Sequence, residues 1–169
     1  MSSDRRPRST PELLALLERF VRGGDELVAA VKDLSQGEFL AVPVPGRWSV
    51  QQLVVHLYES EIVACDRMRR IAAMERPLLM GFDENAFTAR LRAERLDGAL
   101  AASGLALNRR LLAPILSAFA ADDPATFDRE GVHSERGIVT LAGILEGDCR
   151  HLEHHMTFLR EKLAVLGRR

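Results

Sequence analysis

The chain has 169 residues, of which 47% are hydrophobic, and this fits a single domain with a substantial core. Its formal net charge is −1, so no excess of positive charge draws it to nucleic acid or to an anionic membrane. No segment reaches the roughly 18 apolar residues that a membrane span needs. Cys65 and Cys149 have no CxxC partner. We therefore expect a cytoplasmic protein without disulfides.

The first helix is predicted from about Thr10 to Leu34, where apolar residues recur at helical spacing. Ser9 or Thr10 can cap its start. Gly23-Gly24 weakens its middle, so we expect a kink or an early end there. The preceding residues 1–9 are basic and lead into no apolar segment, and they are predicted to form a disordered tail.

The next segment, from Ser35 to Trp48, is rich in proline and glycine and is predicted to be a loop. The second helix has the clearest start signal in the chain. Ser49 is followed three residues later by Gln52, which is the spacing of a capping box. This helix is predicted to continue to about Glu75, because Pro77 prevents further extension.

Residues 78–95 fit either a short helix capped within Asp83-Glu84-Asn85 or a lid over a site. A third long helix is predicted over about Leu96 to Ala120, and residues 121–137 are polar and read as a loop. The fourth helix is predicted from near Thr140 to about Leu166. No alternating strand pattern lies between the helices.

Four long helices within one domain predict an all-α fold, an up-down four-helix bundle over residues 10–169. The two long connections, 78–95 and 121–137, are expected to frame the mouth of any pocket, because loops on a rigid scaffold usually carry function.

Two of the five histidines, His151 and His155, stand four residues apart on the last predicted helix. This spacing is about 40° around the helix axis and one turn along it, so both rings can reach one point. His155 lies close to the leucine stripe of this helix and His151 lies on its edge, whereas His154 points outward. The position on the helix therefore selects His151 and His155 as a pair.

His56 lies in an apolar run on the second helix, between Leu53 and Leu57. A buried imidazole without a partner costs free energy, and metal sites in bundles are built from side chains on facing helices. We therefore predict that His56, His151 and His155 bind one divalent metal ion. Three imidazoles leave coordination positions open, as catalytic sites do. The alternative is a set of packed, hydrogen-bonded histidines without metal.

Further side chains are candidates for supporting the ligands or lining a pocket: Glu59, Glu61, Arg67, Asp148 and His154. Either glutamate could orient His56, although a solvated face is the alternative for Glu59. Asp148 lies on the buried stripe and needs a partner, either a ligand histidine or an arginine. Arg67 belongs to a basic stretch that is usually solvated, but it could hold an anion. The residues alone assign no general base.

Three segments of this sequence resemble the DinB/YfiT-like superfamily. Residues 45–50 together with Leu53–Glu61 are similar to the tryptophan-serine and histidine-leucine pattern of its second helix. His133–Leu141 is like the segment that precedes its last helix, and His151–His155 matches its His-x-x-His-His signature.

The resemblance implies a four-helix bundle, often a homodimer, that binds nickel, zinc, iron or manganese through His56, His151 and His155. Members of the family include thiol-dependent S-transferases and mycothiol-dependent maleylpyruvate isomerases, in which the metal activates a low-molecular-weight thiol. Glu59 stands where many members have aspartate, and Thr157-Phe158 follows the histidine pair where a glutamine is common. These departures leave the subfamily and its substrate undetermined.

Our leading hypothesis is a metal-dependent enzyme that acts on a small-molecule substrate. Transfer of a thiol is the first choice, and hydrolysis by metal-activated water is the second. The competing hypothesis is a non-catalytic stress-response or ligand-binding bundle with a structural metal. A helical dimerisation module without metal is the third.

Overall fold

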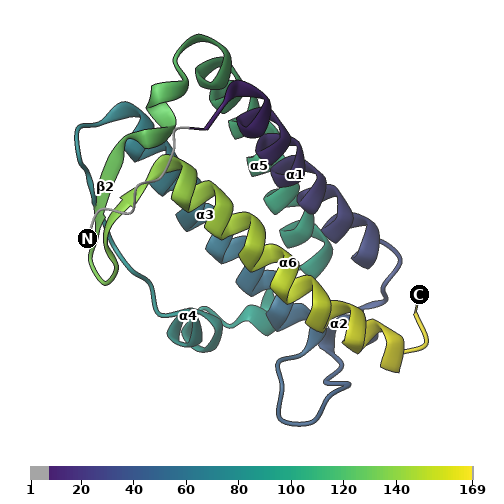
Figure 1. Cartoon of the computed structure of the whole chain (residues 1–169). Helices are drawn as coiled ribbons and strands as arrows, with labels where there is room; N and C mark the ends of the chain where they lie inside the picture. Colours follow the sequence, from purple (N-terminus) through teal and green to yellow (C-terminus); the bar gives the residue numbers. More distant parts are fainter. Residues whose placement is uncertain (1–7, 169) are drawn as a thin grey trace.

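Four long helices make up most of the computed structural model, which describes residues 8–168 (Figure 1). They are α1 (Thr10–Val31), α3 (Val50–Ala73), α5 (Gly98–Asp122) and α6 (Leu141–Val165). The predicted all-α four-helix bundle is therefore confirmed. None of the described helices is both long and apolar enough to cross a membrane.

The helices do not simply alternate in direction along the chain. α1 packs against α5 and α6, and α3 packs against the same two, so the consecutive helices α1 and α3 lie on a diagonal. Gln51 near the start of α3 bonds the Leu96 carbonyl before α5, and Glu61 further along α3 bonds Arg109 further along α5. α3 and α5 therefore run parallel, because the connection between them crosses the length of the bundle (Figure 1). Direction alternates from α1 to α3 and from α5 to α6.

The predicted helix starts are capped as expected. The Ser49 N–H donates to Gln52 Oε1 at 2.9 Å, and the Gln52 N–H donates to Ser49 Oγ at 3.0 Å. Ser9 is the N-cap of α1, and its N–H donates to the Glu12 carboxylate at 2.7 Å. Ser9 is thus part of the helix start rather than of a tail. Arg8 is described as well, and its guanidinium donates to Glu146 Oε1 at 2.5 Å, whereas residues 1–7 of the predicted tail lie outside the described residues.

The expected kink or early end at Gly23-Gly24 is wrong, since α1 continues through both glycines to Val31. A Cβ at Gly24 would lie 3.0 Å from the Cα of Ala106 on α5. Glycine therefore marks the closest approach of two helix backbones, and the packing gained there outweighs its poor helix propensity.

The first connection, predicted to be a loop, contains the short helix α2 (Gln36–Leu40). It begins with a capping box, as α1 and α3 do, in which the Ser35 N–H donates to Glu38 Oε2 at 2.8 Å. In the second connection, Asp83 caps the short helix α4 (Glu84–Arg90) by accepting the Ala86 N–H, which confirms the short-helix alternative. A 3-10 turn, η1 (Ala93–Arg95), follows it.

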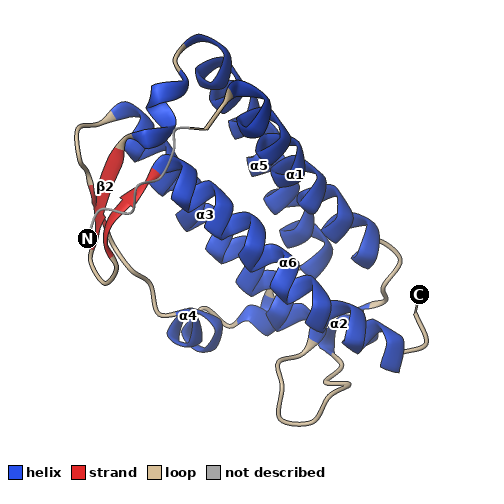
Figure 2. Cartoon of the chain, in the orientation of Figure 1, coloured by secondary structure: helices blue, strands red, loops and turns tan. Residues whose placement is uncertain are grey.

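A small sheet also corrects the expectation of helices and loops alone (Figure 2). After the 3-10 turn η2 (Pro124–Asp128), β2 (Glu130–His133) pairs antiparallel with β3 (Gly137–Thr140) and parallel with β1 (Leu78–Leu79). These strands have two to four residues, too few for an alternating pattern to be recognised. The hairpin closes at Gly137, whose φ of 72° favours glycine.

The hydrophobic core is split into two clusters along the bundle. One contains residues from the sheet-side halves of α3, α5 and α6, and the other contains residues from their opposite halves. Glu61 and Arg109 lie between the clusters on α3 and α5, and Asp148 and His151 lie where the clusters meet on α6. This polar layer positions the candidate site.

Candidate metal centre

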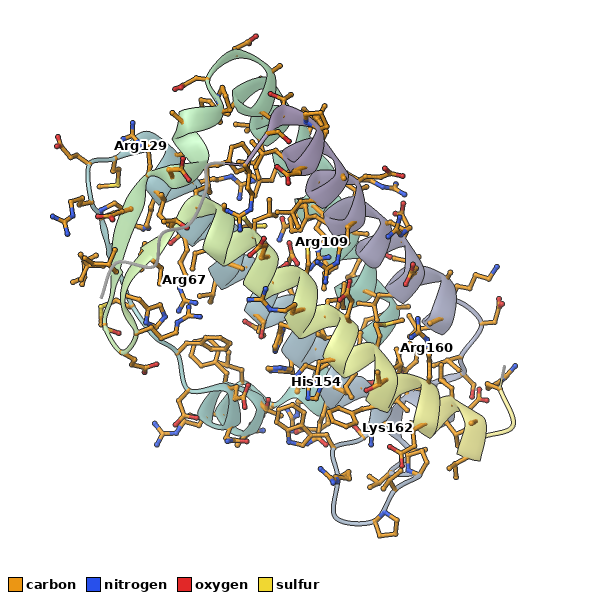
Figure 3. All side chains as sticks on the ribbon, in the orientation of Figure 1. Arg67, Arg109, Arg129, His154, Arg160 and Lys162 are labelled. Carbon is orange, nitrogen blue, oxygen red and sulfur yellow. The ribbon has the colours of Figure 1, made fainter. Side chains whose placement is uncertain are left out.

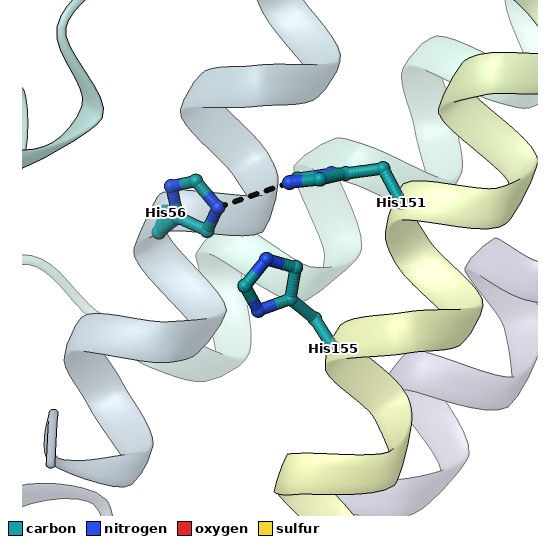
Figure 4. Close-up of side chains that lie close together, drawn as sticks. All are labelled: His56, His151 and His155. Atoms are coloured by element: carbon teal, nitrogen blue, oxygen red, sulfur yellow. Dashed lines mark hydrogen bonds between the residues drawn. The ribbon is translucent and has the colours of Figure 1, made fainter.

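Three histidines converge from two helices, as Figure 4 shows. His56 comes from α3, while His151 and His155 lie one turn apart on α6. One nitrogen of each ring lies within 4.8 Å of the others, and Nε2 of His56 is 3.2 Å from Nε2 of His151. Residues 8–168 hold no other such group of histidine, cysteine or acidic side chains. The antiparallel packing of α3 on α6 creates this meeting point.

Apolar surroundings hold the three rings in place and keep them uncharged. His56 is 2% exposed, and the Trp48 ring packs against it at 5.0 Å between centroids. Burial, with smaller contributions from His151 and His155, lowers the pKa of His56 to about 3. Burial and the neighbouring His155 lower the pKa of His151 to about 4, and burial also lowers the pKa of His155. All three imidazoles are therefore neutral at pH 7, with lone pairs free to coordinate.

The donor set fits a divalent transition metal. Two imidazole nitrogens at about 2.0–2.1 Å from one tetrahedral ion lie roughly 3.3 Å apart, close to the His56–His151 separation. Nδ1 of His155 is buried and has no hydrogen-bond partner in the described part of the protein. Such an atom is costly unless something coordinates it. Metal binding by these histidines remains a prediction that the geometry favours.

Stability of the metal-free protein should depend on pH through His56. Folding lowers the pKa of His56 from 6.5 to about 3, so the unfolded chain takes up more protons as the pH falls. This contribution is present above pH 6.5 and is lost toward pH 3. We expect a loss of about 2 kcal/mol between pH 7 and pH 5 from this group. Urea unfolding of wild type and of His56→Leu, each at both pH values, measures it. Equal losses in the two proteins would contradict the prediction.

A buried arginine, Arg109, which Figure 3 labels, joins two buried acids in the polar layer next to the histidines. Arg109 on α5 is 1% exposed, and its Nε donates to Glu61 at 2.7 Å. Its other nitrogens donate to Asp148 and, at 2.8 Å, to the Phe20 carbonyl. Glu61 therefore faces Arg109 rather than His56, and of the two partners expected for Asp148 the arginine is the one observed.

This network has one cation for two carboxylates. Burial and the adjacent Glu61 raise the pKa of Asp148 to about 8, while Arg109 opposes the shift. Burial disfavours the charge of Arg109, but the two acids outweigh it and raise its pKa. Arg109 thus stays charged, and one of the acids favours holding a proton. Burial likewise raises the pKa of the Cys65 thiol, which donates to Glu61 at 3.1 Å.

The remaining candidates lie around this centre. Glu59 is half-buried, and burial raises its pKa, but no hydrogen bond joins it to a histidine in the described chain. His154 is exposed, as predicted, and packs edge-on against Phe158 with 4.7 Å between ring centroids. Arg67 is half-buried beside the hairpin and donates to the Met80 carbonyl (Figure 3).

The family model of the DinB superfamily matches residues 19–159 of the chain. This protein belongs to the DinB superfamily. The match includes all three histidines and both acids of the buried network.

Two further comparisons agree with this DinB assignment. A protein of Bacillus mycoides (strain KBAB4) described as "Putative metal-dependent hydrolase BcerKBAB4_2443" is 29% identical over 143 residues, which cover 82% of this chain and 80% of that protein. The structure of YfiT from Bacillus subtilis, described as "a probable metal-dependent hydrolase with an unusual four-helix bundle topology", superimposes with a TM-score of 0.85 at 21% identity. The superposition covers 99% of this chain and 94% of the YfiT chain. This second similarity shows the fold.

Two residues of this DinB site escaped the sequence interpretation. Arg109 continues the stripe formed by Leu105, Leu112 and Leu116, all buried, so helical periodicity alone could have placed it inside. The other is Glu84 at the start of α4, whose Oε2 lies 3.7 Å from Nε2 of His56. No local pattern predicts that contact, because the chain between α3 and α5 brings Glu84 back to the site.

Proposed function

We propose that this DinB-superfamily protein is a metal-dependent hydrolase acting on a small-molecule substrate. The observation that carries the proposal is the convergence of three neutral imidazoles on one point. The names of the two similar Bacillus proteins support hydrolysis, and the geometry of the donors supports a metal.

The chain supplies the ligands and the surroundings of the reaction. Three imidazoles leave at least one position open, and a divalent metal bound there would supply the Lewis acidity that lowers the pKa of an incoming nucleophile. Burial of His56 and His151 keeps their rings neutral, so the ligands need not lose protons at neutral pH. A cavity of about 370 Å³ adjoins the site and is lined by His151 and Glu84. A volume of this size accommodates a small molecule.

Glu84 is the carboxylate best placed to accept a proton from the nucleophile. Its Oε2 is 3.7 Å from Nε2 of His56, and about half of its side-chain surface is exposed, at 51%. Glu61 and Asp148 are engaged by Arg109 and are not available for this role. Asp83 holds the start of α4 and thereby positions Glu84.

Replacing Glu84 with glutamine should lower kcat at least about 100-fold, because the amide cannot accept the proton. Metal content should not change, since the three histidines are intact. Steady-state kinetics and elemental analysis of Glu84→Gln measure both. Glu94→Gln, an exposed glutamate on η1, is the matched control and should retain activity. Equal activity in the two variants would remove Glu84 from the mechanism.

Thiol transfer is the second candidate, because the family that the sequence resembles includes thiol-dependent S-transferases. Cys65 and Cys149 are both buried and burial raises the pKa of both thiols, so any reacting thiol must come from outside the chain. The test is a panel of esters and amides offered to metal-loaded protein with and without added thiol. Turnover without thiol that stops on chelation supports hydrolysis. Turnover only with thiol supports transfer, and no metal-dependent turnover in either series would overturn the enzyme proposal.

The homodimer and the cytoplasmic location remain predictions. So does the choice among nickel, zinc, iron and manganese.

A further inference from the structure

The cavity beside the histidines extends along the groove between α3 and α6. On α3 it is lined by Ser60, Ala64 and Arg67, which follow His56 at successive turns of one helix face. On α6, Gly147 and Ile144 precede His151 in the same way. Because α3 and α6 are antiparallel, both series lead away from the histidines toward the hairpin. Arg67 lies eleven residues beyond His56, which is about 16 Å along the helix.

Arg67 lines this far part of the cavity, and one of its donors has no partner in the described chain. One terminal nitrogen donates to the Met80 carbonyl, which orients the guanidinium. Its Nε is buried and has no hydrogen-bond partner among residues 8–168. Polar groups this well buried are nearly always bonded, so this N–H favours an acceptor from outside the described chain.

The hairpin contributes two more donors to the same part of the cavity. His133 is 4% exposed, and its Nδ1 accepts the Glu135 N–H at 3.2 Å, so the neutral ring carries its proton on Nε2. Arg136 is exposed and also lines the cavity. Its charge acts on both Arg67 and His133.

The acids of the cavity offset these donors only in part. The charge of Glu135 acts on both Arg67 and His133, opposite to that of Arg136, and its carboxylate lies against Gly81, where an added Cβ would come 2.4 Å from Oε1. Asp148 is held by Arg109, and Glu84 lies beside His56. Two guanidinium groups and one carboxylate therefore leave a net positive charge at the hairpin side of the cavity.

We infer that this cavity binds a substrate with an anionic group, a carboxylate or a phosphate, which Arg67 receives together with His133 and Arg136. The reacting bond of the substrate then lies at the histidine side, so the inference rests on the proposed function for that part. The planar guanidinium matches both kinds of oxyanion. Gly147 lines the cavity between Ile144 and His151 and places no side chain in it.

The test is a titration of the metal-free full chain with sodium succinate and, separately, with inorganic phosphate. Omitting the metal removes direct coordination of the anion as an explanation. The signal is the ¹H–¹⁵N resonance of the arginine Nε groups, with calorimetry for affinity. Saturable binding that shifts the Arg67 resonance is expected for at least one anion. The anion that binds more tightly indicates whether the substrate carries a carboxylate or a phosphate.

Arg67→Gln should weaken this binding at least about tenfold, because a charged hydrogen-bond donor is lost. Arg136→Gln should weaken it severalfold, and since Arg136 is exposed this variant does not endanger the fold. Arg69→Gln, an exposed arginine on the same helix, is the matched control and should bind as wild type does. Absence of saturable binding of both anions, or equal affinity in wild type and both cavity variants, would overturn the inference.

Failure of this inference and failure of the proposed function can be told apart. Anion binding is measured without metal, whereas metal content and turnover are measured without regard to Arg67. Protein that binds succinate but never metal would keep the anion site and lose the hydrolase. Protein that binds metal and hydrolyses only neutral substrates, with no anion binding, would keep the hydrolase proposal and refute the anion site.

Discussion

Protein with both His151→Ala and His155→Ala should be purified without transition metal, whereas wild type should contain close to one ion per chain. The double variant removes two of three nitrogens that lie within 4.8 Å of one another. Loss of even an outer partner of a metal ligand costs about 10–100-fold in affinity, so loss of two ligands should exceed that range. Elemental analysis after reloading with nickel, zinc or manganese is the measurement.

His154→Ala provides the control for this result. His154 lies beside His155 in the sequence but is exposed and outside the cluster. The variant should therefore keep its metal, and His56→Ala should lose it as the double variant does. A wild-type protein that takes up none of these metals would refute the site and, with it, the proposed enzyme.

Arg109→Met should destabilise the protein by about 3–5 kcal/mol, the usual cost of breaking a buried ion pair from one side. The variant leaves Glu61 and Asp148, which are 0% and 8% exposed, without their cation. It also removes the bond to the Phe20 carbonyl and the packing of the guanidinium on the Phe20 ring at 4.5 Å. Denaturant unfolding at pH 7 measures the difference.

Arg110→Met is the matched control one residue later on α5. Arg110 pairs with Asp25 on the surface, where both side chains are about half exposed, and such pairs contribute less than about 1 kcal/mol. Adding Glu61→Gln and Asp148→Asn to Arg109→Met should recover part of the loss, because no uncompensated charge then remains buried. Equal effects of Arg109→Met and Arg110→Met would show that the network is not a major source of stability.

Much of the fold could be predicted because its signals are local. The Ser49–Gln52 capping box and the Asp83 cap each involve residues within a few positions of one another, and both appear in the structure. The errors also have local causes. The strands of the sheet are too short for a period to appear in the sequence, and the capping box at Ser35 lies beside prolines and glycines that favour a loop.

Part of the candidate site could also be predicted from local sequence, and part depends on which helices are neighbours. The spacing of His151 and His155 on one helix face is a local property, and the apolar run around His56 indicates burial. The 3.2 Å approach of His56 to His151 requires α3 and α6 to be neighbours. Helical periodicity predicts which face of each helix is buried but not which helix covers it.

The sequence by itself thus determined the four long helices, their capped starts and the three histidines, because each depends on the chemistry and spacing of nearby residues. Only the tertiary structure decided that α3 and α5 run parallel and that Arg109 donates hydrogen bonds to Glu61 and Asp148. It also decided that Glu84 and Arg67 line one cavity. These contacts join residues far apart in the chain. They are set by how the helices pack and by how the connections return across the bundle, which no local pattern encodes.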